Sequence, residues 1–256
     1  MRPNKVIEAW QAGETAFAAW TNTESSYIAE VLGHTGADAV VIDMQHGMAD
    51  MHSALSMLQA ISATPASPFV RVPGLDPRLI MKLLDYGSYG LICPLVDNAE
   101  QAEAFVVASS YPPRGGRSYG PVRGLLYGGP DYLDAADRTI VRLAMIETRA
   151  GLDNMEAICQ VDGLEGIFIG PSDLSLSLGS KPRPEPAEDQ VEEAIARCLD
   201  AAHKAGKKAG IFCFGVEGAQ RRTAQGFDFV VPHSDSFHMA KAYRAALEAA
   251  RASKKN

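Results

Sequence analysis

The chain lacks the features that mark membrane, secreted and nucleic-acid-binding proteins. No stretch approaches the roughly 18 consecutive apolar residues of a membrane span, and residues 1–10 carry charge where a signal peptide would carry an apolar core. The 24 basic residues are outnumbered by 31 acidic ones, which gives a net charge of -7. Because nucleic acids attract basic surfaces, we expect no nucleic-acid partner and no membrane contact.

Cysteine is scarce, and its positions form no motif. Cys93, Cys159, Cys198 and Cys213 are spread through the chain without a C-x-x-C pair. Disulfide frameworks and zinc sites need paired or clustered cysteines. We therefore expect reduced core residues in a cytoplasmic protein.

Two signatures of common α/β enzymes are also missing. Residues 20–24, which follow the first apolar segment, contain no Gly-rich dinucleotide fingerprint. Lysines such as Lys82, Lys204 and Lys208 fall on expected helices or just before a strand. A Schiff-base enzyme on a barrel needs a desolvated lysine on a strand, so this chemistry is not expected.

The chain does contain a regular alternation of apolar, strand-like segments and amphipathic helices. The expected strands are residues 15–20, 37–43, 68–72, 89–97, 143–147, 166–171, 208–214 and 228–232. About eight such βα units close naturally into a barrel, with an open doubly wound sheet as the alternative. We predict a single (β/α)8 TIM barrel over residues 1–256, with a helix before it at residues 5–11 and a last amphipathic helix at Ser236 to Ala252.

Two neighbouring strands of this barrel end in a carboxylate, Glu147 after residues 143–146 and Asp173 after residues 166–171. Parallel strands place their C-terminal ends at one edge, so the two carboxylates should converge there. Carboxylate oxygens suit a hard divalent cation such as Mg²⁺ or Mn²⁺. A helix N-cap at Ser172 or Asp173 is the alternative, but the pairing with Glu147 favours a metal site.

The segment Gly170-Pro171-Ser172-Asp173 precedes an expected helix. Amides in the first turn of a helix have no partner within the helix and can bind an anion. We therefore predict that these four residues bind substrate, for instance a carboxylate beside the metal.

Further polar residues lie at the ends of the second and third strands. Asp43, Gln45 and His46 follow one strand, and Arg71 lies in the apolar run of the next. His46 has the side chain best suited to proton transfer near neutral pH, with a bond to a loop carbonyl as the alternative. A buried Arg71 needs an anion, either a substrate or an internal partner such as Asp43.

Residues 111–130 are rich in Gly, Pro, Arg and Tyr. Loops of this length in a compact domain are often lids or binding loops. Arg123 and its neighbours are candidates for closing over an anionic substrate, or for an oligomer interface. Asp85 lies at the end of a helix, where the helix dipole disfavours an acid, so it is expected either to have a partner or to be a solvated surface acid.

In this order and spacing, the segments resemble the HpcH/HpaI family of class II pyruvate aldolases. The matching segments are residues 42–47, 71–73, 94–100, 111–115, 146–147 and 167–179. The flanking strands and helices fit the same barrel at both ends. The resemblance therefore covers nearly the whole chain.

The resemblance implies roles for individual residues. In such aldolases a Glu and an Asp at the positions of Glu147 and Asp173 hold Mg²⁺, Mn²⁺ or Co²⁺. The essential arginine falls on Arg71, and the catalytic histidine falls on His46. Further catalytic acids of the family fall on Asp43 and on Asp85, the latter as the partner of His46. Family members are typically hexamers, arranged as trimers of dimers, whose last helix packs on a neighbouring subunit.

The activity implied is reversible aldol cleavage of 4-hydroxy-2-oxo acids to pyruvate, or hydroxypyruvate, and an aldehyde. Two alternatives stay open: a carbon–carbon lyase of the malyl- or citramalyl-CoA kind, and a non-catalytic barrel that binds a 2-oxo acid. Many family members have Asp-x-Glu-His where this chain has Gln45 before His46. We predict that the neutral Gln45 admits hydroxypyruvate as the donor.

Overall fold

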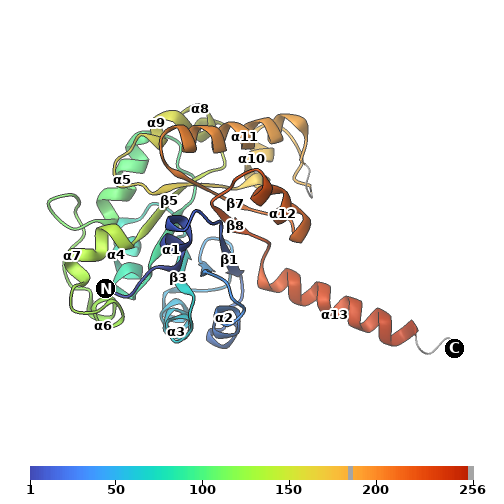
Figure 1. Ribbon diagram of the computed structural model, residues 1–256, viewed down its shortest axis with the longest axis horizontal. Coiled ribbons are helices and arrows are strands. Elements are labelled where there is room, and N and C mark those ends of the chain that lie inside the picture. Colours follow the sequence, from blue (N-terminus) through green and yellow to red (C-terminus); the bar gives the residue numbers. More distant parts are fainter. Residues whose placement is uncertain (184–186, 253–256) are drawn as a thin grey trace.

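The computed structural model describes residues 1–183 and 187–252. Eight parallel strands form a closed barrel in the order β1 to β8, with helices around it (Figure 1). The strands are β1 (Ala16–Thr21), β2 (Ala39–Asp43), β3 (Ser67–Arg71), β4 (Gly90–Cys93), β5 (Val141–Ile146), β6 (Gly166–Ile169), β7 (Lys208–Phe212) and β8 (Phe229–Val231). The predicted (β/α)8 barrel is confirmed.

The helices follow the strands as the alternation predicts. They are α1 (Lys5–Gln11), α2 (Ser26–Gly33), α3 (Met51–Ser62), α4 (Pro77–Asp85), α5 (Ala99–Ser109), α6 (Val122–Gly128), α7 (Tyr132–Thr139), α8 (Arg149–Asp153), α9 (Met155–Cys159), α10 (Pro171–Ser177), α11 (Asp189–Lys204), α12 (Val216–Ala224) and α13 (Asp235–Ala252). Side chains such as Ser25, Asp50 and Asp76 accept hydrogen bonds from first-turn amides and so fix where helices begin. In the described chain, no helix combines the length and the apolar character needed to cross a membrane.

Large rings fill the barrel interior. The ring centroids of Phe69 and Phe229 are 5.7 Å apart, and those of Phe168 and Phe229 are 6.1 Å apart. Gly90 lies directly against Phe69, and a Cβ at this glycine would be 2.2 Å from the ring. Small residues such as Gly90 leave room for large rings such as Phe69, so the barrel interior is closely packed.

Side chains alternate along each strand between this interior and the helix layer. Phe69 of β3 and Met145 of β5 belong to the interior cluster. Residues two positions further along, Arg71 and Glu147, therefore point into the barrel at its C-terminal end, which we call the mouth. The same alternation brings Asp43 of β2 to the mouth.

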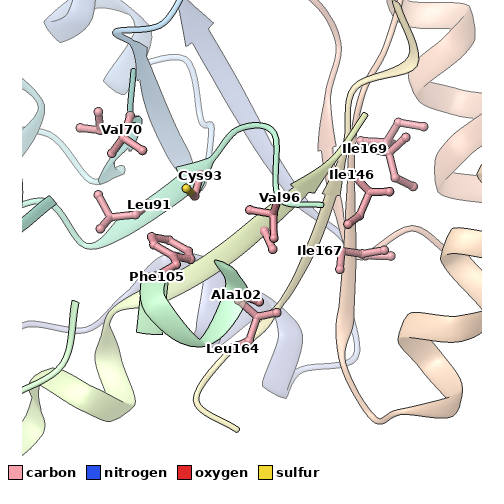
Figure 2. Close-up of a cluster of buried hydrophobic side chains, with 14 of the residues drawn as sticks. Val70, Leu91, Cys93, Val96, Ala102, Phe105, Ile146, Leu164, Ile167 and Ile169 are labelled. Atoms are coloured by element: carbon pink, nitrogen blue, oxygen red, sulfur yellow. The ribbon is translucent and has the colours of Figure 1, made fainter. Parts of the chain in front are cut away.

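The outward-facing side chains form a second cluster under the helices. Figure 2 shows part of it, in which Leu91 and Cys93 of β4 lie with Phe105 of α5, and Ile146 of β5 lies near Ile169 of β6. All four cysteines are buried in the core, as the sequence predicts. Strands buried on both faces explain why the apolar segments show no alternation of polar residues.

Residues 111–130 do not form a lid over the mouth of their own chain. They include α6, and the Tyr127 ring packs edge-on against Tyr89, 4.9 Å between centroids, just before β4 begins. The Arg2 amide donates to Gly128 O at 2.8 Å. Both contacts are at the N-terminal end of the barrel, opposite the mouth. The prediction of a lid is wrong within one chain, because the aromatic and arginine side chains of this stretch find partners at the other end.

The last helix, α13, follows β8 but leaves the barrel. It extends away from the body, and none of its residues is buried (Figure 1). In a closed (β/α)8 barrel the eighth helix covers the outer face of β8 and β1. Here the side chains of Phe17, Val31 and Val216 around that face are exposed.

Candidate active site

A cavity of about 240 Å³ opens at the mouth of the barrel. Among the residues predicted from sequence, Asp43, His46 and Arg71 line it from the side of β2 and β3, and residues 170–173 line it from the side of β6. The alternation of strand residues thus gathers side chains that are far apart in the sequence.

Arg71 and Asp43 form a buried, bidentate ion pair. Arg71 Nε and Nη2 donate to the two Asp43 carboxylate oxygens at 2.9 and 2.6 Å. The Trp20 indole N–H donates to the same carboxylate at 3.3 Å, and its ring lies 4.9 Å below the guanidinium. The internal partner expected for Arg71 is therefore present, and Nη1 is left facing a cavity that Arg71 lines.

Asp43 also holds the loop that carries His46. Its Oδ1 accepts hydrogen bonds from the Gln45 and His46 amides at 3.1 and 3.2 Å. Burial alone would raise the pKa of Asp43, but the Arg71 guanidinium and these two amides hold it below its ordinary value. Asp43 is thus a fixed anion that orients two other residues.

Glu147 is the buried member of the predicted metal pair. It is 2% exposed and accepts a hydrogen bond from the Leu95 amide at 2.9 Å. Burial raises the pKa of Glu147 to about 7, and the negative charge of Asp173 adds to the rise. Leu95 adopts a positive φ of 55° at this point, which costs a non-glycine residue about 1–2 kcal/mol.

Gly170 lets the backbone between β6 and α10 approach Glu147. A Cβ on Gly170 would lie 2.7 Å from Glu147 Oε2 and 2.5 Å from Met145 Cε. Asp173 then follows in the first turn of α10, with an exposed side chain. First-turn amides lack partners within a helix, so Ser172 and Asp173 bring backbone donors as well as a carboxylate to the cavity.

The chemistry of Glu147 and Asp173 fits a hard divalent cation. The only protein donor found on the Glu147 carboxylate in the described chain is the Leu95 amide, which leaves most of its lone pairs for a cation. In the same residues, no three or more His, Cys, Asp or Glu side chains are grouped as metal ligands. Mg²⁺ often takes one or two carboxylates and completes its shell with water and substrate oxygens. The pair therefore suits a metal that also binds substrate.

His46 lies exposed at the edge of the cavity. The far end of its loop is tied to β1, because the Met48 amide donates to Asn22 O at 2.9 Å. Beside it, the Gln45 side-chain Oε1 is buried with no hydrogen-bond partner among the described residues. A buried acceptor without a partner costs free energy. Gln45 lies next to His46 in the loop but is not among the residues that line the cavity.

Asp85 is not brought to the cavity. It is the last residue of α4, so it lies at the end of the barrel opposite the mouth. Its carboxylate accepts a hydrogen bond from Arg117 Nη2 at 2.8 Å, and Arg117 is completely buried. The expected partner of Asp85 exists, but within one chain it is Arg117, so the expected pairing with His46 is wrong there.

Arg123 also lies away from the cavity. Its guanidinium donates to Tyr86 O and, at 2.8 Å, to Ser62 Oγ, so it joins the C-terminal ends of α3 and α4. Half-buried and engaged in this way, Arg123 cannot contact a substrate bound at the mouth of its own chain. Within one chain, the predicted contact of Arg123 with substrate is therefore not found, because its guanidinium is bound at the opposite end of the barrel.

Trp20, Asn22, Phe212 and Ser234 also line the cavity, but charge and motif do not predict them. The only feature of the sequence that could have predicted them is their position relative to the expected strands. Each lies at or just beyond the end of a strand, and Trp20 and Asn22 are two residues apart, as inward-facing positions are. Strand ends of β1, β7 and β8 thus complete the wall that the predicted residues begin.

The fold and this site define a (β/α)8-barrel enzyme equipped to stabilise negative charge on a small, anionic substrate. The chain belongs to the HpcH/HpaI aldolase/citrate lyase family, whose model matches residues 17–242. The family resemblance read from the sequence motifs is thereby confirmed.

Individual relatives match along nearly their whole length. A hydroxypyruvate/pyruvate aldolase of Rhizorhabdus wittichii is 45% identical over 249 residues, 97% of this chain and 99% of that protein. A 4-hydroxy-2-oxovalerate aldolase of Rhodococcus jostii is 38% identical over 240 residues, 93% of this chain and 92% of that protein. A solved HpcH/HpaI aldolase/citrate lyase family protein of Burkholderia cenocepacia superposes with a TM-score of 0.91 at 31% identity, covering 97% of this chain and 99% of its own.

Proposed function

We propose that this protein is a divalent-metal-dependent aldolase that reversibly cleaves 4-hydroxy-2-oxo acids to an aldehyde and pyruvate or hydroxypyruvate. The carbon–carbon lyase class follows from the family and from aldolase relatives at 38% and 45% identity. The observation that carries the mechanism is the buried Glu147 carboxylate, whose pKa is raised to about 7 by burial and, to a smaller extent, by the charge of Asp173.

The reaction needs stabilisation of an enolate. A divalent cation held by Glu147 and Asp173 supplies, when bound, Lewis acidity toward the keto oxygen of the 2-oxo acid. Arg71 offers Nη1 to the same developing charge, since Asp43 holds its other two nitrogens. A preorganised donor of this kind is worth about 3–4 kcal/mol. The amides of Ser172 and Asp173 bind the substrate carboxylate.

His46 moves the proton. In cleavage it takes the proton from the C4 hydroxyl, so the C3–C4 bond breaks to give an aldehyde and the enolate of pyruvate. In condensation it returns a proton to the new C4 alkoxide. Asp43 acts through its neighbours, because it orients Arg71 and holds the His46 loop.

Gln45 favours a donor with one more hydroxyl than pyruvate. Its buried Oε1 lacks a donor in the described structure, and the hydroxyl of hydroxypyruvate would supply one. We expect Gln45→Glu to lower kcat/KM for hydroxypyruvate relative to pyruvate, measured with one common aldehyde. An unchanged ratio of the two donors in the variant contradicts this role.

The assembly in this proposal is a homo-oligomer in which α13 of a second copy covers the exposed face of β8 and β1. A groove of about 500 Å³ lies there, and Ile28 and Val31 of α2 are part of its lining. On α13, Met239, Tyr243 and Leu247 recur every four residues and are exposed. An apolar stripe of this kind fits an apolar groove. The family resemblance points to a hexamer.

Assembly also bears on Asp85. Because Asp85 and His46 lie at opposite ends of one barrel, a pair between them requires two subunits. The cysteines are few, buried and spread through the core, as in proteins of a reducing compartment, and we propose a cytoplasmic location.

A lyase for CoA thioesters would need a basic, nucleotide-sized cleft at the mouth. Arg117 is instead buried against Asp85, and Arg123 joins two helices at the other end. These observations favour the aldolase. Cleavage of malyl-CoA by the purified protein would reverse that preference.

Exchange of the pyruvate methyl protons in D2O tests the proposed function. We expect exchange that EDTA abolishes and that Mg²⁺ or Mn²⁺ restores, and we expect borohydride with pyruvate to leave the enzyme active. A borohydride-trapped adduct contradicts the metal mechanism. Absence of exchange at any metal concentration favours a barrel that only binds 2-oxo acids.

A further inference from the structure

His233 has an unusual backbone conformation at the mouth of the barrel. In the described chain, Leu95 and His233 are the non-glycine residues with positive φ, at 55° and 106°. Such conformations are costly for a residue with a Cβ and persist where function requires them. Leu95 presents its amide to Glu147, whereas His233 has no role in the mechanism above.

The surroundings of His233 fix its ring and its tautomer. The ring stacks on Phe237 with centroids 3.7 Å apart, and it meets the Phe212 ring edge-on at 5.3 Å. The Ser234 amide donates to Nδ1 at 2.8 Å. Burial, and then the neighbouring His238, lower the pKa of His233, so the neutral ring carries its proton on Nε2. His233 is therefore an oriented hydrogen-bond donor.

His233 lies on the wall of the cavity formed by β8 and β1. Ser234 forms a parallel bridge with Trp20, which joins the ends of these two strands. His233, Ser234 and Asn22 all line the cavity on this wall. In the barrel order, β1 lies opposite β5, which carries Glu147. This wall is thus across the mouth from the metal pair, where the aldehyde half of the substrate would extend.

Asn22 adds a complementary group. Its side-chain Oδ1 is buried and has no hydrogen-bond partner among the residues described. Its backbone is held firmly, because its amide donates to Asp235 Oδ1 at 2.9 Å. A hydroxyl group needs one donor and one acceptor to be fully satisfied. His233 Nε2–H and Asn22 Oδ1 supply one of each.

We propose that His233 and Asn22 form a specificity site for the acceptor, in which His233 donates to, and Asn22 accepts from, a hydroxyl of a hydroxylated aldehyde. The proposal rests on the aldolase function and names the substrate class of its second half-site. Acceptors with a hydroxyl beside the aldehyde satisfy both groups. Purely apolar acceptors leave both unpaired, which sites of this kind penalise.

His233 is a binding residue in this scheme and not a second base. Among the described residues, no carboxylate hydrogen-bonds its ring, whose Nδ1 is already used by the Ser234 amide. A purely structural role would not explain the conformation, because glycine at this position would relieve the backbone at no steric cost. The side chain is retained at the expense of stability.

The test compares glycolaldehyde with acetaldehyde as acceptors for pyruvate. In His233→Gly we expect the ratio of kcat/KM for glycolaldehyde to kcat/KM for acetaldehyde to fall roughly 10-fold or more. We expect Asn22→Ala to show the same selective loss. His34→Ala, an exposed histidine at the other end of the barrel, is the matched control.

Pyruvate methyl-proton exchange is measured in parallel, because it needs no acceptor. Exchange that persists in both variants, with a selective loss of glycolaldehyde relative to acetaldehyde, supports the specificity site. An equal loss for both aldehydes, or no loss for either, overturns it while leaving the aldolase function in place. A wild-type enzyme without exchange removes the proposed function, and this proposal with it.

Discussion

At the scale of single residues, the Arg71–Asp43 pair shows how a buried carboxylate fixes the orientation of a guanidinium. Two of the three guanidinium nitrogens are committed to one carboxylate, and the Trp20 ring supports the guanidinium from below. Removing either partner would leave an unpaired buried charge, which typically costs about 3–5 kcal/mol. The pair therefore fixes Arg71 in one orientation, ready for an anion.

Arg71→Lys keeps the charge and removes the bidentate geometry. We expect kcat/KM to fall about 10²–10³-fold and the free energy of unfolding to fall by about 1–3 kcal/mol. Steady-state kinetics and urea denaturation measure the two effects. Arg78, whose side chain is 88% exposed in its pair with Asp76, supplies the control. A fully active Arg71→Lys enzyme would show that the second guanidinium bond is dispensable.

Glu147 predicts a pH dependence for the metal-free protein. Its folded pKa, about 7, lies above the ordinary 4.5. The folded state therefore holds the proton more tightly than the unfolded state, so the contribution to stability is fully present below about pH 4.5 and is lost as pH rises through about 7. In EDTA, we expect the free energy of unfolding to decline by up to roughly 3 kcal/mol between those pH values.

The matched variant for this titration is Glu147→Gln, which keeps the shape and removes the charge. Denaturant unfolding over the same pH range should show no such decline in the variant. Addition of a divalent ion at pH 8 should restore stability to the wild type alone. Parallel pH profiles for the two proteins would contradict the raised pKa.

The sequence pattern predicted some of the residues that lie at the mouth of the barrel and failed to predict others, and both outcomes have a physical reason. Glu147 and Asp173 were predictable, because strand ends of a parallel barrel converge regardless of sequence distance. Asp85 and Arg123 lie away from the cavity of their own chain, since a helix end returns to the far side of the barrel and the sequence alone does not predict which side a loop covers. Trp20 was missed because a tryptophan at a strand end reads as core.

At the scale of elements, the junction of β6 and α10 is the most constrained turn of the site. Gly170→Ala places a Cβ 2.7 Å from Glu147 Oε2, so either the carboxylate or the turn must move. We expect divalent-ion affinity to fall by roughly 10-fold or more, with a smaller effect on stability. Isothermal titration with Mn²⁺ measures the affinity.

Gly120→Ala provides the comparison for Gly170→Ala, because a Cβ on Gly120 meets no heavy atom within 4 Å. Its Mn²⁺ affinity should match that of the wild type. Unchanged affinity in Gly170→Ala as well would mean that Glu147 is not a metal ligand, or that it holds the metal from another position.

Element boundaries were predictable where local chemistry decides them. Asp76 followed by Pro77 predicts the start of α4, and the structure shows the Asp76 side chain capping that helix. The fourth strand was predicted over residues 89–97, but β4 spans only Gly90–Cys93, because the chain turns after Cys93 and presents the Leu95 amide to Glu147. The helix α6 was missed, since its glycines and neighbouring prolines read as loop.

At the scale of the whole molecule, the alternation of eight strands and helices sufficed to predict the barrel. The sequence pattern predicted that the last helix exists, but it did not predict where this helix lies relative to the barrel. α13 projects outward from the barrel and carries an exposed apolar stripe. Exposed apolar patches of this kind mark interaction sites. The stripe therefore supports the proposed homo-oligomer, in which α13 packs on a second copy.

This prediction can be tested on the stripe itself. Tyr243 and Leu247 are 69% and 52% exposed, so in a lone chain Tyr243→Asp with Leu247→Asp should leave barrel stability nearly unchanged. In an assembly the two new charges would be buried in an apolar groove, which is costly. We expect light scattering after gel filtration to show a smaller species for the double variant. If Asp85 of a neighbouring subunit pairs with His46, the aldolase activity of this variant should also be reduced. The control is Lys241→Glu on the opposite face of α13, which should keep the wild-type mass of the assembly. An unchanged assembly mass in the double variant would mean that α13 does not pack through this stripe.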